Sequence, residues 1–189
     1  MRIIAGEARG RRIEAPEGRN TRPTLDRVRE NLFNMLQGEI SGSRVLDLFA
    51  GSGALSFEAL SRGAEYACLV DHDRKASAVQ IKNADTLGYR DRTRIMTSDW
   101  RRALKEIEST GKCFDMVFLD PPYAKLDLTD VFSGLIPVLG EDAIIVLEHE
   151  AGKNPETGAG YECVKQRNWG FCGVSLYRRN EANEERDAK

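Results

Sequence analysis

The residues whose types and spacing could do chemistry follow the ends of apolar, strand-like runs. The first group is Asp47 and, just after it, a turn that carries Gly51 and Gly53. Glycines let the backbone approach a ligand closely, and the start of a following helix offers unpaired N–H groups. The carboxylate of Asp47 can meet a cationic or hydroxyl group. We therefore predict that this turn binds a nucleotide-like ligand. The alternative is a tight strand-to-helix turn with Asp47 as a capping acid.

Two further acids follow the next strand-like runs. Asp71 lies 71 − 51 = 20 positions after Gly51, where an acid can hold two ribose hydroxyls in an NAD enzyme or in a methyl-donor enzyme. The dinucleotide fingerprint G-x-G-x-x-G is incomplete, because Ser56 stands at its third glycine. Asp99 can accept a hydrogen bond from an adenine amino group, or it can cap the helix expected from Trp100. Both roles stay open.

The most specific group is Asp120, Pro121, Pro122 and Tyr123, directly after an apolar run. Two prolines in succession remove two N–H donors and restrict the backbone. Their carbonyl oxygens and the Asp120 carboxylate then make a pocket rich in hydrogen-bond acceptors, which suits an amine with two N–H bonds. Tyr123 adds a flat face for stacking on a planar base. We predict a pocket for the exocyclic amine of a nucleobase; the alternative is a rigid turn.

The pattern of the chain predicts how these residues are positioned. Strand-like runs alternate with helix-like segments, which is typical of a parallel sheet with helices on both faces. Two final runs around Trp169 and Gly170 predict an antiparallel hairpin. The fold class is therefore α/β. The predicted strands are 44–48, 66–70, 94–97, 114–119, 143–148, 162–168 and 172–178, and the predicted helices are 54–61, 74–87, 100–109 and 127–139.

Charge is spread unevenly along the 189 residues, whose net charge is −2. Residues 1–29 hold eight Arg and four acids, 8 − 4 = +4, which leaves −6 for the remainder. We expect residues 1–40 to form a basic extension of short strands and a helix, packed on a domain spanning 41–180, with a polar tail at 181–189. Thr24 can cap the helix, whose apolar positions are Leu25, Val28, Leu32, Met35 and Leu36.

Several function classes are disfavoured by composition. Four isolated cysteines without a C-x-x-C pair, and only two His, predict reduced thiols in or near the core and no metal site. The apolar runs are shorter than a membrane span requires, and the first residues lack a secretory signal. We therefore expect a cytoplasmic protein.

The motifs resemble those of a known family. The stretch from Asp47 to Gly53 (DLFAGSG), with Asp120 to Tyr123 (DPPY), is similar to the class I S-adenosylmethionine-dependent methyltransferases that modify exocyclic amines of nucleobases. The segments MRIIAGEARGRRI and TRPTLDRVRENLFNML resemble the RsmD-type 16S rRNA (guanine-N(2))-methyltransferases of bacteria. The likeness runs from Met1 to about Arg178. It departs at Asp71, where such enzymes often have Glu, and at Ser56-Phe57, where a smaller pair is usual.

The resemblance implies a Rossmann-like class I methyltransferase fold that binds S-adenosylmethionine. Its target is a guanine 2-amino group of 16S rRNA in the small ribosomal subunit or a late precursor, at guanine 966 in conventional bacterial numbering. The enzyme is expected to be a monomer. The implied catalytic residues are Asp120, Pro121, Pro122 and Tyr123; the implied cofactor residues are Asp47, Phe49, Ala50, Gly51, Gly53, Asp71 and Asp99; and the arginines expected to contact RNA are Arg2, Arg9, Arg11, Arg12 and Arg22.

Three other functions remain open from the sequence. An adenine 6-amino methyltransferase acting on DNA or RNA would use the same pocket. A non-catalytic RNA-binding assembly factor could keep a methyltransferase fold, since fold alone does not prove activity. An NAD-dependent oxidoreductase would share the ribose-binding acid.

Overall fold

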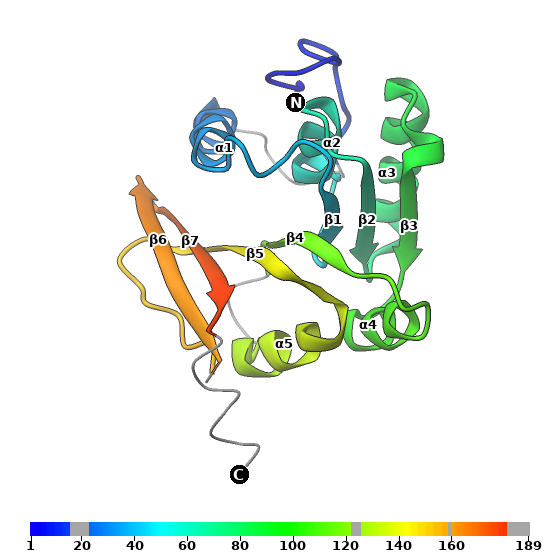
Figure 1. The fold of residues 1–189 in the computed structure, drawn as a ribbon. Coiled ribbons are helices and arrows are strands. Elements are labelled where there is room, and N and C mark those ends of the chain that lie inside the picture. Colours follow the sequence, from blue (N-terminus) through cyan, green and yellow to red (C-terminus); the bar gives the residue numbers. More distant parts are fainter. Residues whose placement is uncertain (16–22, 122–125, 159, 181–189) are drawn as a thin grey trace.

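The protein is described by a computed structural model covering residues 1–15, 23–121, 126–158 and 160–180 (Figure 1). A seven-stranded sheet has the order β3-β2-β1-β4-β5-β7-β6. The strands β1 to β5 pair in parallel, whereas β7 pairs antiparallel with both β5 and β6. The predicted mixed sheet is confirmed. Its strands are β1 (Arg44–Asp47), β2 (Tyr66–Asp71), β3 (Thr93–Thr97), β4 (Phe114–Leu119), β5 (Leu139–Glu150), β6 (Tyr161–Trp169) and β7 (Cys172–Arg179).

Helices cover both faces of the sheet. One face carries α1 (Pro23–Met35), α2 (Ala54–Ser61) and α3 (Arg74–Leu87), and the other carries α4 (Trp100–Glu108) and α5 (Leu128–Leu135). In Figure 1, α1 and α2 lie above the sheet, α3 overlaps β2 and β3 in the view, and α4 and α5 lie below the sheet. Each of β1 to β4 is followed by a helix that packs back on the sheet, so the carboxyl ends of the parallel strands share one edge. The predicted functional acids therefore meet at that edge.

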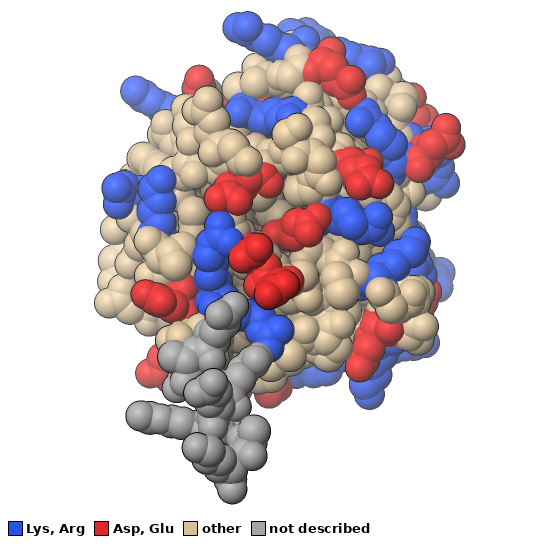
Figure 2. Space-filling model, in the orientation of Figure 1, with Lys and Arg blue, Asp and Glu red and all other residues tan. Residues whose placement is uncertain are grey.

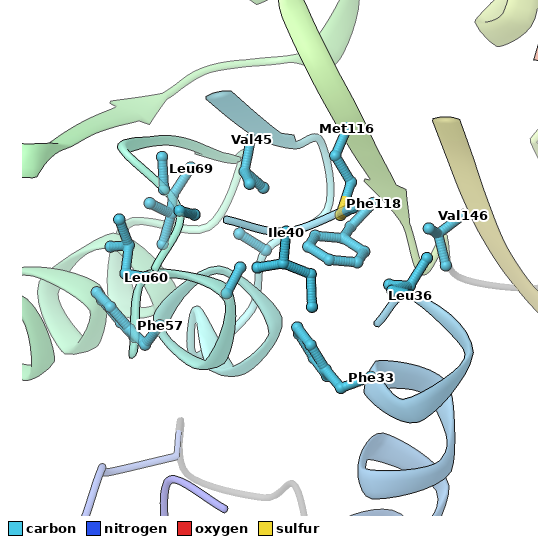
Figure 3. Packing of buried hydrophobic residues seen from close by; sticks show 14 of the residues in the cluster. Phe33, Leu36, Ile40, Val45, Phe57, Leu60, Leu69, Met116, Phe118 and Val146 are labelled. Atoms are coloured by element: carbon cyan, nitrogen blue, oxygen red, sulfur yellow. The ribbon is translucent and has the colours of Figure 1, made fainter. Parts of the chain in front are cut away.

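Two hydrophobic clusters, one on each face, hold the layers together. Met116 and Phe118 of β4 belong to the cluster under α1 to α3, whereas Val117 and Leu119 belong to the cluster under α4 and α5. This alternation follows from the two-residue period of a strand that is buried on both faces. Figure 3 shows Phe33 of α1 beside Phe118, with ring centroids 5.9 Å apart. The helix of the basic extension is therefore part of the core.

Element boundaries differ from the prediction around α5. The helix predicted over 127–139 ends at Leu135, and a 3₁₀ turn, Ile136–Val138, follows. Pro137 has no N–H to continue the helical bonding, which explains the early end. The strand predicted from residue 143 begins instead at Leu139, which pairs with Phe114 of β4. The predicted helix extended too far because the residues 136–139 are all apolar, and an apolar run is compatible with a helix or with a strand.

The N-terminal residues also differ from the prediction. Residues 1–15 contain one isolated bridge, between Arg2 and Arg12, and turns in place of strands; we call this segment the N-terminal hairpin. The backbone of α1 is helical from Pro23, so Thr24 lies in the first turn and not at the cap. A proline is well suited to the first helical position, because its φ already matches the helix.

The exposure of the four cysteines agrees only in part with the prediction. Cys68 is buried and Cys172 is partly buried, but Cys113 and Cys163 are exposed, so the prediction of core or near-core thiols is wrong for these two. Cys113 directly precedes the buried Phe114, whereas Cys163 lies on β6 between the exposed residues Glu162 and Val164. Over the described part of the chain, no helix is long and apolar enough to cross a membrane.

Candidate active site

The glycine turn joins the end of β1 to the start of α2. Gly51 and Gly53 have φ values of 53° and 79°, in the left-handed region that favours glycine. A Cβ at Gly53 would lie 2.5 Å from the Phe57 ring and 2.7 Å from the side chain of Leu69. The backbone N–H of Ala50 donates to the carbonyl of Val70 at 3.0 Å. The turn is therefore tied to β2 and leaves no room for a side chain at Gly53.

Asp71 connects the end of β2 to this turn. Its carboxylate accepts the backbone N–H of Gly51 at 2.8 Å and that of Asp73 at 2.9 Å. Each carboxylate oxygen can accept more than one hydrogen bond, so Asp71 retains capacity for hydroxyl donors. The predicted partner of a ribose therefore lies directly against the glycine turn. Asp73 caps α3 by accepting the N–H of Lys75 at 2.8 Å.

Asp47 is a buried carboxylate at the end of β1, with only 2% of its surface exposed. Burial, with a smaller contribution from the nearby charge of Asp71, raises the pKa of Asp47 to about 7. The hydroxyl of Ser56 donates to Asp47 at 2.9 Å and opposes this rise. Ser56 is the residue that interrupts the dinucleotide fingerprint, and here it supports the acid. A ligand cation beside Asp47 would favour the charged form.

Two side chains of α3 brace the glycine turn, and sequence reasoning missed them. The amide of Gln80 donates to the carbonyl of Gly51 at 2.9 Å. The amide of Asn83 donates to the carbonyl of Ser52 at 3.0 Å and to that of Glu14 at 3.0 Å. Both side chains are buried. Uncharged polar residues on the inward face of a helix were the available signal, because buried amides need partners.

Asp99 follows β3 and caps α4. Its carboxylate accepts the N–H of Arg101 at 2.9 Å, so the capping role is confirmed. The backbone N–H of Ser98 donates to the carbonyl of Asp71 at 2.9 Å, which brings the end of β3 beside the end of β2. Asp99 therefore shares the edge with Asp71, and contact with adenine stays a prediction.

Asp120 follows β4 at the same edge of the sheet. Asp47 of β1 is in register with Phe118, two residues before Asp120. Pro121 is buried, while Pro122 and Tyr123 lie outside the described residues. On the other side, Leu119 is in register with Leu147 of β5. Asp120 therefore follows β4, which lies between β1 and β5 in the sheet, and β1 is the strand that leads into the glycine turn.

A thiol and a second acid accompany Asp120. Burial raises the pKa of the Cys172 thiol, and the charges of Glu148 and Asp120 raise it further. Cys172 begins β7 and is in register with Glu150 of β5. The thiol beside these carboxylates therefore stays protonated at neutral pH. Over the described part of the chain, no three His, Cys, Asp or Glu side chains are grouped as metal ligands would be.

A buried carboxylate on α2 holds the N-terminal hairpin, and the sequence analysis did not single it out. Glu58 is fully buried and accepts the backbone N–H groups of Ile4 at 2.7 Å and Ala5 at 3.0 Å. Its other partners are Arg62 at 2.8 Å and, at 4.0 Å, the buried guanidinium of Arg29 on α1. One carboxylate therefore joins the N-terminal hairpin, α1 and α2.

The N-terminal arginines have different surroundings. Arg11 donates to the carbonyls of Leu87 and Thr86 at the end of α3, which is a capping role. Arg2 donates to the carbonyl of Gly10 at 3.1 Å. Arg9 and Arg12 are exposed, and Arg22 lies outside the described residues. In the view of Figure 2, Lys and Arg side chains are interspersed with Asp and Glu. RNA contact by these arginines stays a prediction.

The chain matches known proteins along nearly its whole length. A model for the family described as "Conserved hypothetical protein 95" matches residues 1–178. The "Ribosomal RNA small subunit methyltransferase D" of Escherichia coli K12 is 38% identical and covers 100% of this chain and 94% of its own. The protein of the same name from Haemophilus influenzae is 35% identical over 94% of this chain and 93% of its own.

A solved structure has the same architecture. It is titled "Putative methyltransferase yhhF from Escherichia coli", with a TM-score of 0.83, 36% identity, and coverage of 95% of this chain and 98% of that chain. The architecture is therefore the class I methyltransferase fold. With a family model over residues 1–178 and a relative that covers the whole of this chain, the chain belongs to the family described as "Conserved hypothetical protein 95", the RsmD family.

Proposed function

We propose that this protein transfers a methyl group from S-adenosylmethionine to the 2-amino group of a guanine in 16S rRNA of the small ribosomal subunit. Guanine 966 is the position that the family resemblance implies. One observation carries the proposal. Asp120 follows β4, which lies directly beside β1 and its glycine turn, so an acceptor for an amine and a cofactor turn share one edge of the sheet. The names of the family relatives support an rRNA substrate.

The donor set at the glycine turn fits this cofactor. Asp47 and Asp71 are carboxylates, which accept hydrogen bonds and carry negative charge. S-adenosylmethionine has a sulfonium, an ammonium group and two ribose hydroxyls, and it supplies the electrophilic methyl group. Asp71 would hold the ribose hydroxyls and Asp47 would face the cationic end. Asp99, at the end of the neighbouring strand, would accept the adenine amino group.

Asp120 and Pro121 act on the amine of the base. An amine attached to an aromatic ring is a weak nucleophile, because its lone pair is delocalised. Hydrogen bonds from its two N–H groups to the Asp120 carboxylate and the Pro121 carbonyl favour a more tetrahedral nitrogen. The same acceptors stabilise the positive charge that develops on the nitrogen in the transition state. Holding the amine in line with the methyl group lowers the barrier by several kcal/mol.

The target guanine must leave its stack, or come from an unpaired loop, to reach this edge. Basic side chains outside the pocket would hold the phosphates, and this contribution weakens as salt rises. No metal takes part in the proposed transfer.

The test uses methyl-labelled S-adenosylmethionine with three substrates: small subunits lacking the modification, the same rRNA stripped of protein, and duplex DNA. Each product is digested to nucleosides. Label in 2-methylguanosine from subunits or rRNA supports the proposal. Label in 6-methyladenine would keep the amine pocket and overturn the substrate. Absence of label in all three, with measurable cofactor binding, would favour a binding role without catalysis.

A pair of variants tests the pocket. Asp120→Ala should abolish transfer and leave the affinity for S-adenosylmethionine unchanged. Asp142→Asn is the matched control, because Asp142 is an exposed acid near the opposite end of β5. Full activity of Asp120→Ala would show that the amine is held elsewhere.

A further inference from the structure

The turn between β6 and β7 presents a phenylalanine to solvent. Phe171 is 96% exposed, while the other exposed large hydrophobic side chains of the described residues, such as Val164 and Ile136, are about half buried. A single exposed apolar residue is common on protein surfaces and assigns nothing by itself. The position of Phe171 and the charge around it are two further observations.

Phe171 lies at the same edge of the sheet as the candidate active site. The backbone N–H of Ala151, just after β5, donates to the carbonyl of Phe171 at 3.0 Å, and Glu150 is in register with Cys172. Three strand spacings of about 4.8 Å separate β4 from β6, or about 14 Å. Stacked nucleotides rise about 3.4 Å each, so a few nucleotides span that distance. In Figure 1 the turn stands at the left margin of the sheet.

The hairpin that carries Phe171 is basic. Residues 161–179 hold four Lys and Arg and one acid, 4 − 1 = +3, although the whole chain is at −2. Arg178 and Arg179 lie at the end of β7 away from the turn, in register with Glu162 and Tyr161, so Lys165 and Arg167 are the basic residues toward the turn. Lys165 and Arg167 are exposed, on the same face of β6 as Trp169, which packs against the core cluster under α1 to α3. Over the described part of the chain, no carboxylate pairs with either basic side chain. The hairpin therefore offers positive charge beside an exposed ring.

We propose that the β6–β7 turn binds an unpaired nucleotide of the rRNA strand next to the target guanine, with Phe171 stacked on the base and Arg167 on a phosphate. This inference rests on the proposed function, and it adds a second contact to the substrate. Exposed aromatic side chains beside basic ones are how proteins hold single-stranded RNA, because every base has a flat face and every linkage has a charge. Charge complementarity favours RNA as the occupant.

The first test compares Phe171→Ala, Phe171→Leu and Phe171→Trp in methylation of small subunits. We expect the alanine and leucine variants to raise KM for subunits about 10-fold, with kcat and the affinity for S-adenosylmethionine unchanged, because lost stacking weakens binding uniformly. The tryptophan variant should retain the wild-type KM. Ile136→Ala is the matched control, an exposed apolar residue remote from this edge. A wild-type KM for Phe171→Ala, or full rescue by leucine, would overturn stacking.

The second test identifies what Phe171 contacts. A photoreactive benzoylphenylalanine at position 171 is irradiated in complex with small subunits, and the cross-linked component is identified. Cross-linking to 16S rRNA supports the proposal, while cross-linking to a ribosomal protein, or to nothing, overturns it. Failure of the proposed function would be seen separately, because the wild-type protein would then place no methyl label in 2-methylguanosine.

Discussion

The hydroxyl of Ser56 donates a hydrogen bond of 2.9 Å to the carboxylate of Asp47 in the interior of the protein. Asp47 ends β1, and Ser56 lies in the first turns of α2, so the bond closes the glycine turn between them. The bond stabilises the charged form of Asp47, whereas burial favours the uncharged form and raises its pKa. The ionisation of Asp47 is therefore balanced near physiological pH.

We expect the stability of the ligand-free protein to depend on Asp47. Its ordinary pKa is 3.8 and its folded pKa is about 7, so the folded state binds more protons between these values. Its contribution is full below pH 3.8 and is lost as the pH rises through 7. Between pH 5 and pH 8 the loss is about 3 kcal/mol. Urea unfolding at both pH values should show this loss in wild type and not in Asp47→Asn. If the free energy of unfolding changed with pH in the same way in both proteins, the raised pKa of Asp47 would be contradicted.

Gly53→Ala should destabilise the protein by roughly 3 kcal/mol and abolish cofactor binding. The left-handed backbone costs an L-residue about 1–2 kcal/mol, and the added methyl group meets Phe57 and Leu69. Gly88→Ala is the control, because Gly88 has a similar φ of 76° and no atom within 4 Å of the added carbon. Only the backbone cost of about 1–2 kcal/mol should remain there. Thermal unfolding and cofactor titration measure both effects, and equal losses in the two variants would refute the steric argument.

Glu58→Gln should loosen the N-terminal hairpin. The change leaves the buried Arg29 without its full countercharge, and breaking a buried pair costs about 3–5 kcal/mol. We expect faster amide hydrogen exchange at Ile4 and Ala5, and a higher KM for the RNA substrate. Glu65→Gln, at an exposed acid nearby, should change neither. Unchanged exchange at both amides would show that Glu58 does not hold the hairpin.

Arg9 and Arg11 should differ in what their removal affects. Arg9→Ala, at an exposed position, should weaken RNA binding and reduce the slope of log affinity against log salt by about 1. Arg11→Ala should lower the free energy of unfolding by about 1 kcal/mol, because the carbonyls at the end of α3 lose their donor. Salt-dependent binding and urea unfolding of both variants separate the two roles. The reverse assignment of effects would contradict the observed contacts.

Residue order alone was enough to predict the alternating strands and helices, the antiparallel end of the sheet, and the capping role left open for Asp99. These features depend on neighbours in the chain: a two-residue period makes a strand, a 3.6-residue period makes a helix, and a polar residue before a helix caps it. The shared edge of the functional acids followed as well, because parallel strands joined by helices all end on one side. Pro137 indicated that the helix ends early, but the apolar residues beside it are compatible with a helix or a strand, so the start of β5 could not be predicted.

Tertiary structure decided the contacts between distant residues. Glu58 meets Ile4 across 54 positions, and Arg11 meets Leu87 across 76. Nothing local distinguishes Glu58 from a surface acid. Arg11 is exposed, as Arg9 and Arg12 are, although its guanidinium reaches the end of α3. The packing of the layers decides which charged side chain is buried and which partner it meets, because a charge is stable in the interior only where other groups hydrogen-bond or pair with it. The same holds for Phe171, whose place beside the candidate site depends on the register between β5 and β7.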